Sequence, residues 1–233
     1  MRSHELAERA PAANPPISFA SLRPFQRFLA DVAALVGAAR EPGQPGPSWI
    51  LDVACGTGTV ALHLARAGCA VVGLDPAPTL VEAAERRRHR RGVDRVAFLP
   101  LDVARDPVPG AGGYDAVMSL DARVWSATPG PFLAACRRTL RPGGYGLFLA
   151  PDRGTSLGVA FDELRRTAGL AHAVAGLRWL VPAALLGAGA GEPLPAVSED
   201  GVRRHLAAAG FEVLAARRIF VPEVSVLAWA RAA

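Results

Sequence analysis

Three aspartates end or follow apolar runs of the sequence, and the first stands beside a glycine-rich segment. Asp52 lies within residues 51–59, LDVACGTGT, and Asp75 and Asp102 close the next two apolar runs. Because the carboxyl ends of parallel strands meet at one edge of a doubly wound sheet, we expect the three carboxylates to converge there, where such folds bind ligands. Asp75 is placed to accept both hydroxyls of a ribose. A chance set of surface aspartates is the alternative.

The glycine segment indicates the kind of ligand. Gly56 and Gly58 suit a strand-to-helix turn that needs unusual φ and ψ and lets a ligand approach the backbone. With Ala61 they also satisfy the loose dinucleotide fingerprint. In a dinucleotide site, however, the pyrophosphate sits at the helix N-terminus, where the carboxylate of Asp52 would repel it. The carboxylate suits a ligand with a cationic group near the loop, unless Asp52 only caps the turn.

Apolar runs alternate with helical patterns between residues 49 and 150. We predict strands over 49–54, 70–74, 96–101, 114–120 and 145–150, with helices over 59–67 and 80–91. This alternation is typical of an α/β fold with a mostly parallel, doubly wound sheet, and uniformly apolar strands fit a sheet covered on both faces. Further along we predict a helix over 198–209 and two closing strands over 211–220 and 224–231.

Two additions accompany this domain. Residues 1–48 form an N-terminal arm, with a helix over 18–40 and then a linker rich in proline and glycine. Residues 151–195 break the alternation and contain the apolar stretch 169–191, which Arg178 and Pro182 make a poor membrane span. We therefore expect a domain over 49–233 in which 151–195 is an insertion that covers the substrate.

Composition limits the possible partners and compartment. The chain has 233 residues, 51% of them hydrophobic, and a formal net charge of +5. The chain has no lysine, and all 26 of its Lys and Arg residues are arginine, which indicates a GC-rich coding bias. The positive charge is therefore weak evidence for nucleic-acid binding. We interpret the run 86–91, RRRHRR, as a solvated helix end, where arginines favour the helix dipole. Three widely spaced cysteines and the lack of a signal peptide fit a cytoplasmic protein.

Taken together, the motifs resemble those of the class I S-adenosylmethionine-dependent methyltransferases of the small-molecule type. The resemblance is close over residues 49–150 and looser over 198–233. It rests on LDVACGTG, VVGLDPAPTLVEAAERR, FLPLDV, YDAVMSLDA, LRPGGYGLFL and GFEVL. It implies a Rossmann-like, seven-stranded methyltransferase fold with a mostly parallel sheet, a reversed C-terminal hairpin, an N-terminal helical arm and a helical insertion after the fifth strand.

The resemblance also implies which residues bind S-adenosylmethionine, whose product is S-adenosylhomocysteine. Asp52 would hold the amino-acid end with the loop backbone, Asp75 the ribose hydroxyls, and Asp102 the adenine amino group. The further contacts it implies are Ala54, Gly56, Thr57 and Gly58 in the loop, Pro76 and Leu80 beside the sugar and base, Val103 on the ring, and Ser119 and Leu120 at the sulfonium.

The predicted activity is methyl transfer to an oxygen or nitrogen of a small, partly apolar molecule, with specialised metabolism as one setting. Asp121 and His172 are candidate general bases; the alternative roles are a helix cap for Asp121 and a packed polar group for His172. We expect no metal, because residues 125–133, which follow the fourth strand and Asp121, offer no further carboxylate. Neither nucleic acid nor a membrane is an expected partner, and a homodimer stays open. Two alternatives also stay open: methylation of RNA or protein, and cofactor binding without methylation.

Overall fold

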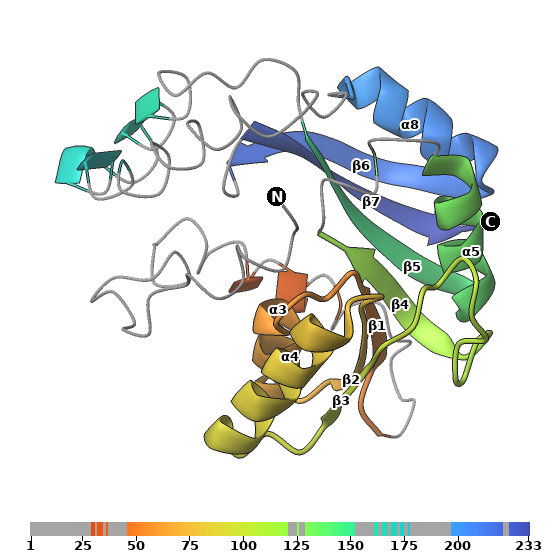
Figure 1. Ribbon diagram of the computed structural model, residues 1–233. Helices are drawn as coiled ribbons and strands as arrows, with labels where there is room; N and C mark the ends of the chain where they lie inside the picture. The colour runs from red at the N-terminus through yellow and green to blue at the C-terminus, as the bar shows by residue number, and fades with distance from the viewer. Residues whose placement is uncertain are drawn as a thin grey trace, which may run out of the picture.

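A seven-stranded sheet runs through the centre of the protein, in the order β3-β2-β1-β4-β5-β7-β6 (Figure 1). The strands are β1 (Trp49–Val53), β2 (Ala70–Leu74), β3 (Val96–Leu99), β4 (Tyr114–Ser119), β5 (Leu140–Pro151), β6 (Phe211–Phe220) and β7 (Val224–Ala232). The first five strands pair in parallel, whereas β7 is antiparallel to both β5 and β6. The Rossmann-like fold with a reversed C-terminal hairpin is therefore confirmed.

This computed structural model describes residues 46–120, 125, 129–151, 197–220 and 224–233, together with scattered positions between 29 and 36 and between 161 and 177. Most of the predicted arm and insertion lies outside these residues. Among the helices that the structure describes, none is long and apolar enough to span a membrane.

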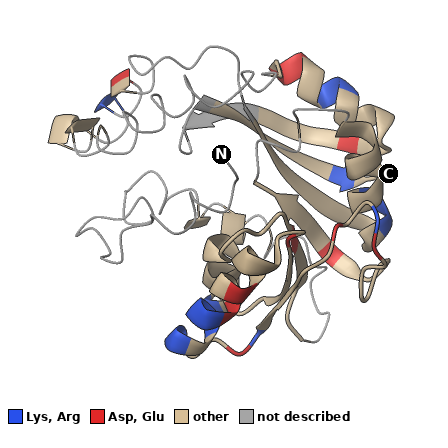
Figure 2. Cartoon of the chain, in the orientation of Figure 1, with Lys and Arg blue, Asp and Glu red and all other residues tan. Residues whose placement is uncertain are grey.

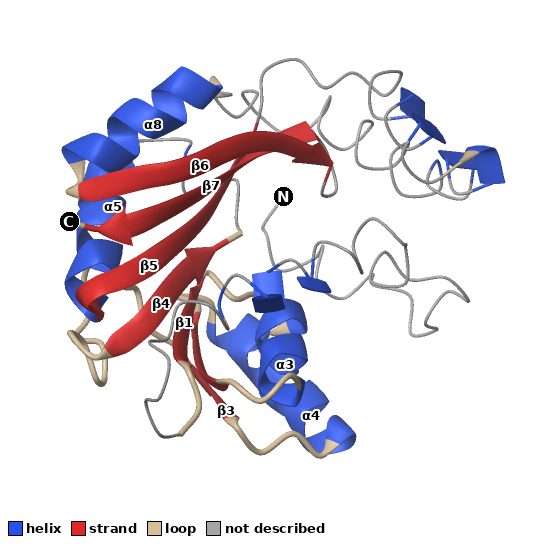
Figure 3. Cartoon of the chain, turned by 180° about the vertical axis from the view of Figure 1, so that it is seen from behind, coloured by secondary structure: helices blue, strands red, loops and turns tan. Residues whose placement is uncertain are grey.

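Helices cover both faces of the sheet (Figure 3). One face carries α3 (Thr59–Arg66) and α4 (Pro78–Arg91), and the other carries α5 (Pro129–Thr139) and α8 (Glu199–Ala208). The described helical positions of the arm include Leu29, Val32 and Val36, which are buried in the same core as α3. This part of the arm therefore packs as core.

Several element boundaries differ from those predicted. β3 ends at Leu99 rather than at 101, and residues 100–113 form turns with no helix, because prolines and glycines interrupt this segment. β5 begins at Leu140, five residues before the predicted start, and α5 had no counterpart among the predicted helices. α4 begins at Pro78 instead of residue 80, since proline is well suited to the first helical position.

The strand order of the sheet reverses between β1 and β4. These strands are neighbours, but the chain leaves β1 toward β2 on one side and β4 toward β5 on the other. Doubly wound sheets bind ligands at such a reversal of strand order. Asp52 in β1 aligns with Gly73 of β2 and Met118 of β4, so Asp52, Asp75 and Ser119 reach the same edge.

Candidate functional site

The glycine loop begins where β1 is broken by a left-handed residue. Ala54 has φ 58°, and Gly56 and Gly58 follow with φ 56° and 72°. Ala54 is the one non-glycine among the described residues with a positive φ, a conformation that side chains with a Cβ disfavour. These angles turn the chain within five residues from the end of β1 into α3, which begins at Thr59.

Close packing explains why two of the nearby positions are glycine. A Cβ on Gly58 would lie 2.5 Å from Cζ of Phe98, and a Cβ on Gly73 would lie 2.5 Å from Cδ1 of the same ring. A Cβ on Gly56, by contrast, would meet nothing within 4 Å. The loop is therefore packed tightly against Phe98 at Gly58 and has open space beside Gly56.

The carboxylate of Asp75 ties the loop to the end of β2. The N–H of Gly56 donates to Asp75 Oδ2 at 2.9 Å, and the N–H of Ala77 donates to Oδ1 at 3.0 Å. Asp75 is buried. Since each carboxylate oxygen has two lone pairs, both oxygens keep capacity for a further donor. The geometry thus suits a ligand that offers two hydroxyl groups beside Gly56.

Asp52 is a buried acid whose proton is held in the unliganded protein. Its carboxyl accepts the N–H of Ala61 in the first turn of α3, so the capping alternative is partly realised. Burial, with a smaller contribution from the nearby charge of Asp75, nevertheless raises the pKa of Asp52 to about 8. Among the described residues no cation pairs with either acid. A ligand cation would favour ionised Asp52.

Asp102 differs from the other two acids, contrary to the expected set of three strand-end carboxylates. It lies three residues beyond the end of β3, in a turn where its carboxylate accepts the N–H of Ala104 at 2.9 Å. Arg105 approaches the same carboxylate at 3.7 Å. The structure therefore brings Asp52 and Asp75 together and gives Asp102 a local, half-buried setting.

The remaining predicted contacts surround this edge at different depths. Gly58, Val103 and Ser119 are buried, Pro76 is exposed, and Ala54, Gly56, Thr57, Leu80 and Leu120 are half-buried. The hydroxyl of Ser119, at the end of β4, is buried and has no hydrogen-bond partner among the described residues. A buried hydroxyl without a partner costs about 1–3 kcal/mol, so this position would suit a polar group of a ligand.

Arg87 contacts the loop, a role that the sequence analysis missed. Its Nη1 donates to Thr57 O at 3.0 Å, to Thr57 Oγ1 at 2.6 Å and to Thr59 Oγ1 at 3.0 Å. Much of the arginine run does form the exposed basic end of α4 (Figure 2). Arg87 departs from this interpretation, and its helical spacing from the buried residues Val81 and Ala84 is the signal that could have revealed it.

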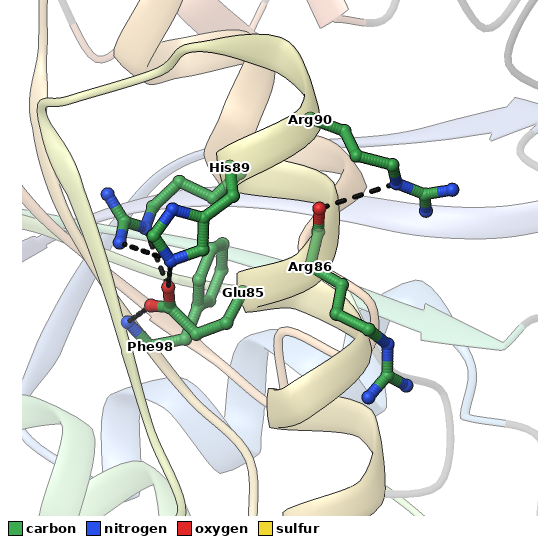
Figure 4. Close-up of polar contacts among 6 residues, drawn as sticks. Glu85, Arg86, His89, Arg90 and Phe98 are labelled. Carbon is green, nitrogen blue, oxygen red and sulfur yellow. Dashed lines mark hydrogen bonds and ion pairs between the residues drawn. The ribbon is translucent and has the colours of Figure 1, made fainter.

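α4 also fixes the ring beneath the loop through Glu85 (Figure 4). The N–H of Phe98 donates to Glu85 Oε1 at 3.2 Å, and Arg88 Nε donates to Oε2 at 2.7 Å. Because β3 is an edge strand, its outward N–H has no strand neighbour, and Glu85 supplies the acceptor. This contact holds the Phe98 ring against Gly58 and Gly73.

Among the described residues, neither a reactive thiol nor a metal-binding cluster lies at this edge. Burial and the nearby charges of Asp52 and Asp75 raise the pKa of the Cys55 thiol, which therefore stays protonated at neutral pH. Within the described ranges, no group of three or more His, Cys, Asp or Glu side chains is placed to hold a metal ion. The candidate bases Asp121 and His172 lie outside the described residues.

Comparisons with known sequences point to one domain type. Residues 50–144 match the family model for a methyltransferase domain. The ubiquinone biosynthesis O-methyltransferase of Caulobacter vibrioides is 30% identical over 146 residues, which are 63% of this chain and 54% of the relative. The enzyme of the same name from Methylocella silvestris is 31% identical over 161 residues, or 66% of this chain and 60% of the relative. The chain thus spans 54% to 60% of these two relatives' length.

Solved structures share the fold across most of the chain. Magnesium protoporphyrin IX methyltransferase from Synechocystis PCC 6803, with bound SAH, aligns with a TM-score of 0.63 at 18% identity, over 95% of this chain and 90% of that one. The 4+2 cyclase SpnF aligns with a TM-score of 0.61 at 18% identity, over 89% of this chain and 81% of that one.

Proposed function

We propose that this chain is a class I S-adenosylmethionine-dependent methyltransferase, which moves a methyl group from S-adenosylmethionine to an oxygen of a small, partly apolar molecule; the match of residues 50–144 to the methyltransferase domain supports this proposal. The observation that carries the proposal is the pair of buried acids, Asp52 and Asp75, which lie beside the glycine loop and pair with no cation of the described residues. Oxygen is favoured over nitrogen because the matched relatives are named O-methyltransferases.

The residues of the site fit S-adenosylmethionine, which supplies a methyl group on a positively charged sulfur. Asp75 accepts the two ribose hydroxyls with the oxygens that already hold Gly56 and Ala77. Asp52 faces the amino-acid end, whose ammonium group takes the place of the missing counter-cation. Asp102 and Val103 receive the adenine, and Ser119 and Leu120 lie near the sulfonium. Together these contacts orient the methyl group toward the acceptor.

For the acceptor side, the proposal concerns a general base and the segment that covers the substrate. An acceptor hydroxyl with a proton at neutral pH would gain from a base, and Asp121 and His172 stay the candidates. We also keep residues 151–195 as a substrate-covering insertion, the cytoplasm as the location and specialised metabolism as one setting.

A second candidate is binding of the cofactor without methyl transfer. It is favoured by one structural neighbour, SpnF, which is named as a cyclase and shares this fold. The acids and the glycine loop serve cofactor binding in either case, so these residues do not separate the two candidates.

Transfer of a radioactive methyl group tests the proposal. The purified chain is incubated with methyl-labelled S-adenosylmethionine and, separately, with a panel of small phenols and catechols, with total RNA, and with denatured protein. We expect label in an organic extract of the phenol reactions and none in the reactions of an Asp75→Ala variant. Label in RNA or protein instead would replace the proposed acceptor class. Cofactor binding by calorimetry with no transfer to any acceptor would favour the second candidate.

A further inference from the structure

We propose that Arg87 is a positioning residue for the cofactor loop: its guanidinium holds residues 57–59 in the shape that binds the cofactor, without touching the cofactor itself. The inference rests on the cofactor binding proposed above. It concerns α4, the helix that follows Asp75, and assigns a function to one arginine of a run that otherwise forms a solvated helix end.

The contacts of Arg87 converge on one short stretch. A single nitrogen, Nη1, donates to a carbonyl oxygen and a hydroxyl of Thr57 and to the hydroxyl of Thr59. The shortest of these distances is 2.6 Å, to Thr57 Oγ1. Hydrogen bonds from a charged donor are roughly twice as strong as neutral ones. Arg87 is also half-buried, so solvent competes less for these contacts than at an exposed position.

The loop needs such a contact because its backbone is intrinsically adaptable. Glycine loses more conformational freedom on ordering than any other residue, and Gly56 and Gly58 flank Thr57. Gly56 is fixed by Asp75, and Gly58 by Phe98, but α3 has no side-chain cap from Gly58 itself. Arg87 supplies the contact between these two points. Because the ordering is done before the ligand arrives, less binding free energy is spent on it.

The neighbouring arginine provides a natural comparison. The Arg86 side chain is 65% exposed and reaches Glu82 on its own helix at 3.5 Å. Arg87 keeps its charge at some cost, because burial and the charges of Arg91 and Arg90 lower its pKa. A residue that served only solubility would have no reason to bear that cost in place of an exposed position.

The test measures binding of S-adenosylhomocysteine alone by calorimetry, so that no acceptor need be known. We expect Arg87→Ala to raise the dissociation constant by about 10-fold, because about 1.4 kcal/mol of loop ordering would then be supplied by binding. Arg86→Ala, the matched control, should stay within about 2-fold, in line with the small contribution of exposed ion pairs. Arg87→Lys, which keeps the charge and part of the reach, should recover part of the lost affinity.

Two further readouts separate positioning from general stability. In the absence of ligand, amide hydrogen exchange at residues 56–59 should be faster in Arg87→Ala than in Arg86→Ala. Melting temperatures of the three variants provide the second readout. Equal affinity in Arg87→Ala and Arg86→Ala would overturn the inference. It would also be overturned if the affinities of Arg87→Ala and Arg87→Lys changed only in proportion to their melting temperatures. If the wild type does not bind S-adenosylhomocysteine, the proposed function fails together with the inference. If the wild type binds and Arg87→Ala binds equally well, only the inference fails.

Discussion

Buried aspartates lie at both edges of the central sheet, but their partners differ. At the amino edge, Asp115 at the start of β4 accepts from the N–H of Trp49 at 2.8 Å and from Arg141 Nε at 2.8 Å. At the carboxyl edge, Asp52 and Asp75 accept from backbone N–H groups, and no described cation pairs with them. Among the described residues, the acid at the amino edge therefore pairs with a cation, whereas the acids at the carboxyl edge do not.

This difference identifies the binding edge from physical chemistry. A buried carboxylate is costly unless it is paired or hydrogen-bonded, or unless it keeps its proton. At the amino edge a guanidinium meets that cost. At the carboxyl edge Asp52 keeps its proton instead, and a cationic ligand can take the proton's place. The lack of a paired cation among the described residues is therefore more informative about function than the presence of acids, which both edges share.

The strongest test of this comparison replaces one acid at each edge of the sheet by alanine. Asp115→Ala should cost about 3–5 kcal/mol in the free energy of unfolding, because it leaves a largely buried arginine without its carboxylate. The surviving folded protein should bind S-adenosylhomocysteine normally. Asp75→Ala should weaken that binding by about 100-fold, since two hydrogen bonds to a charged group are lost. Urea titration and calorimetry measure the two effects, and equal loss of affinity in both variants would contradict the comparison.

Glycine substitutions sharpen the comparison at the next level. Gly58→Ala combines a left-handed backbone with a Cβ placed 2.5 Å from the Phe98 ring, and should cost about 2–5 kcal/mol. Gly92→Ala, at the far end of α4, has a similar φ of 58° but nothing within 4 Å of the new Cβ. It should cost about 1–2 kcal/mol from backbone strain alone. Thermal unfolding gives both values, and binding should fall only for Gly58→Ala.

The proton on Asp52 gives a smaller, pH-dependent effect. The pKa of Asp52 is raised from 3.8 to about 8, so above pH 3.8 the folded state holds a proton that the unfolded chain has lost. Its contribution to stability is therefore complete below pH 3.8 and falls as the pH rises to about 8. Asp52→Asn should remove this part of the slope from denaturant titrations of the unliganded protein.

Ligand binding should report the same proton. If a cation takes its place, binding of S-adenosylhomocysteine near pH 7 releases protons, and the calorimetric heat depends on the ionisation enthalpy of the buffer. Asp52→Asn should abolish that dependence. A wild type that releases no proton would argue against a ligand cation at Asp52.

The smallest expected effect concerns two buried hydroxyls. Ser119→Ala should leave the unliganded protein as stable as before or about 1 kcal/mol more stable, because the Ser119 hydroxyl has no hydrogen-bond partner among the described residues. Thr139→Val should lose about 1 kcal/mol, since Thr139 Oγ1 donates to Cys136 O at 2.7 Å. Thermal unfolding of the unliganded variants compares them. A destabilised Ser119→Ala would show that Ser119 belongs to the structure and not to the site.

Sequence patterns predicted the fold where the chain's own periodicity decides the structure. The alternation of apolar runs and helices gave β1, β2, β4, α3, α8 and the closing strands close to their observed bounds. It placed the end of β3 two residues too late, missed α5, and missed the start of β5, where Pro142 and two glycines conceal a strand that pairs with β4.

The site was predictable only as far as its motif is local. Gly56, Gly58 and Asp75 follow from a strand, a turn and a second strand end, and the structure joins them. Arg87 and Phe98 could not be placed this way, because their roles come from contacts between α4, β3 and the loop, far apart in the sequence. Asp102 was misplaced because β3 ends two residues earlier than its apolar pattern.

The position of β7 has a consequence for synthesis of the chain. β7 follows β6 in sequence but lies between β5 and β6 in the sheet, and β6 pairs with no other strand. While the ribosome has made the chain only as far as β6, β6 has no neighbour to join and the 12-residue β5 presents an open edge. Open edges invite wrong pairing during folding. Emergence of the nine residues of β7 therefore covers the open edge of β5 and gives β6 its partner in one step, with β6 as the new edge strand.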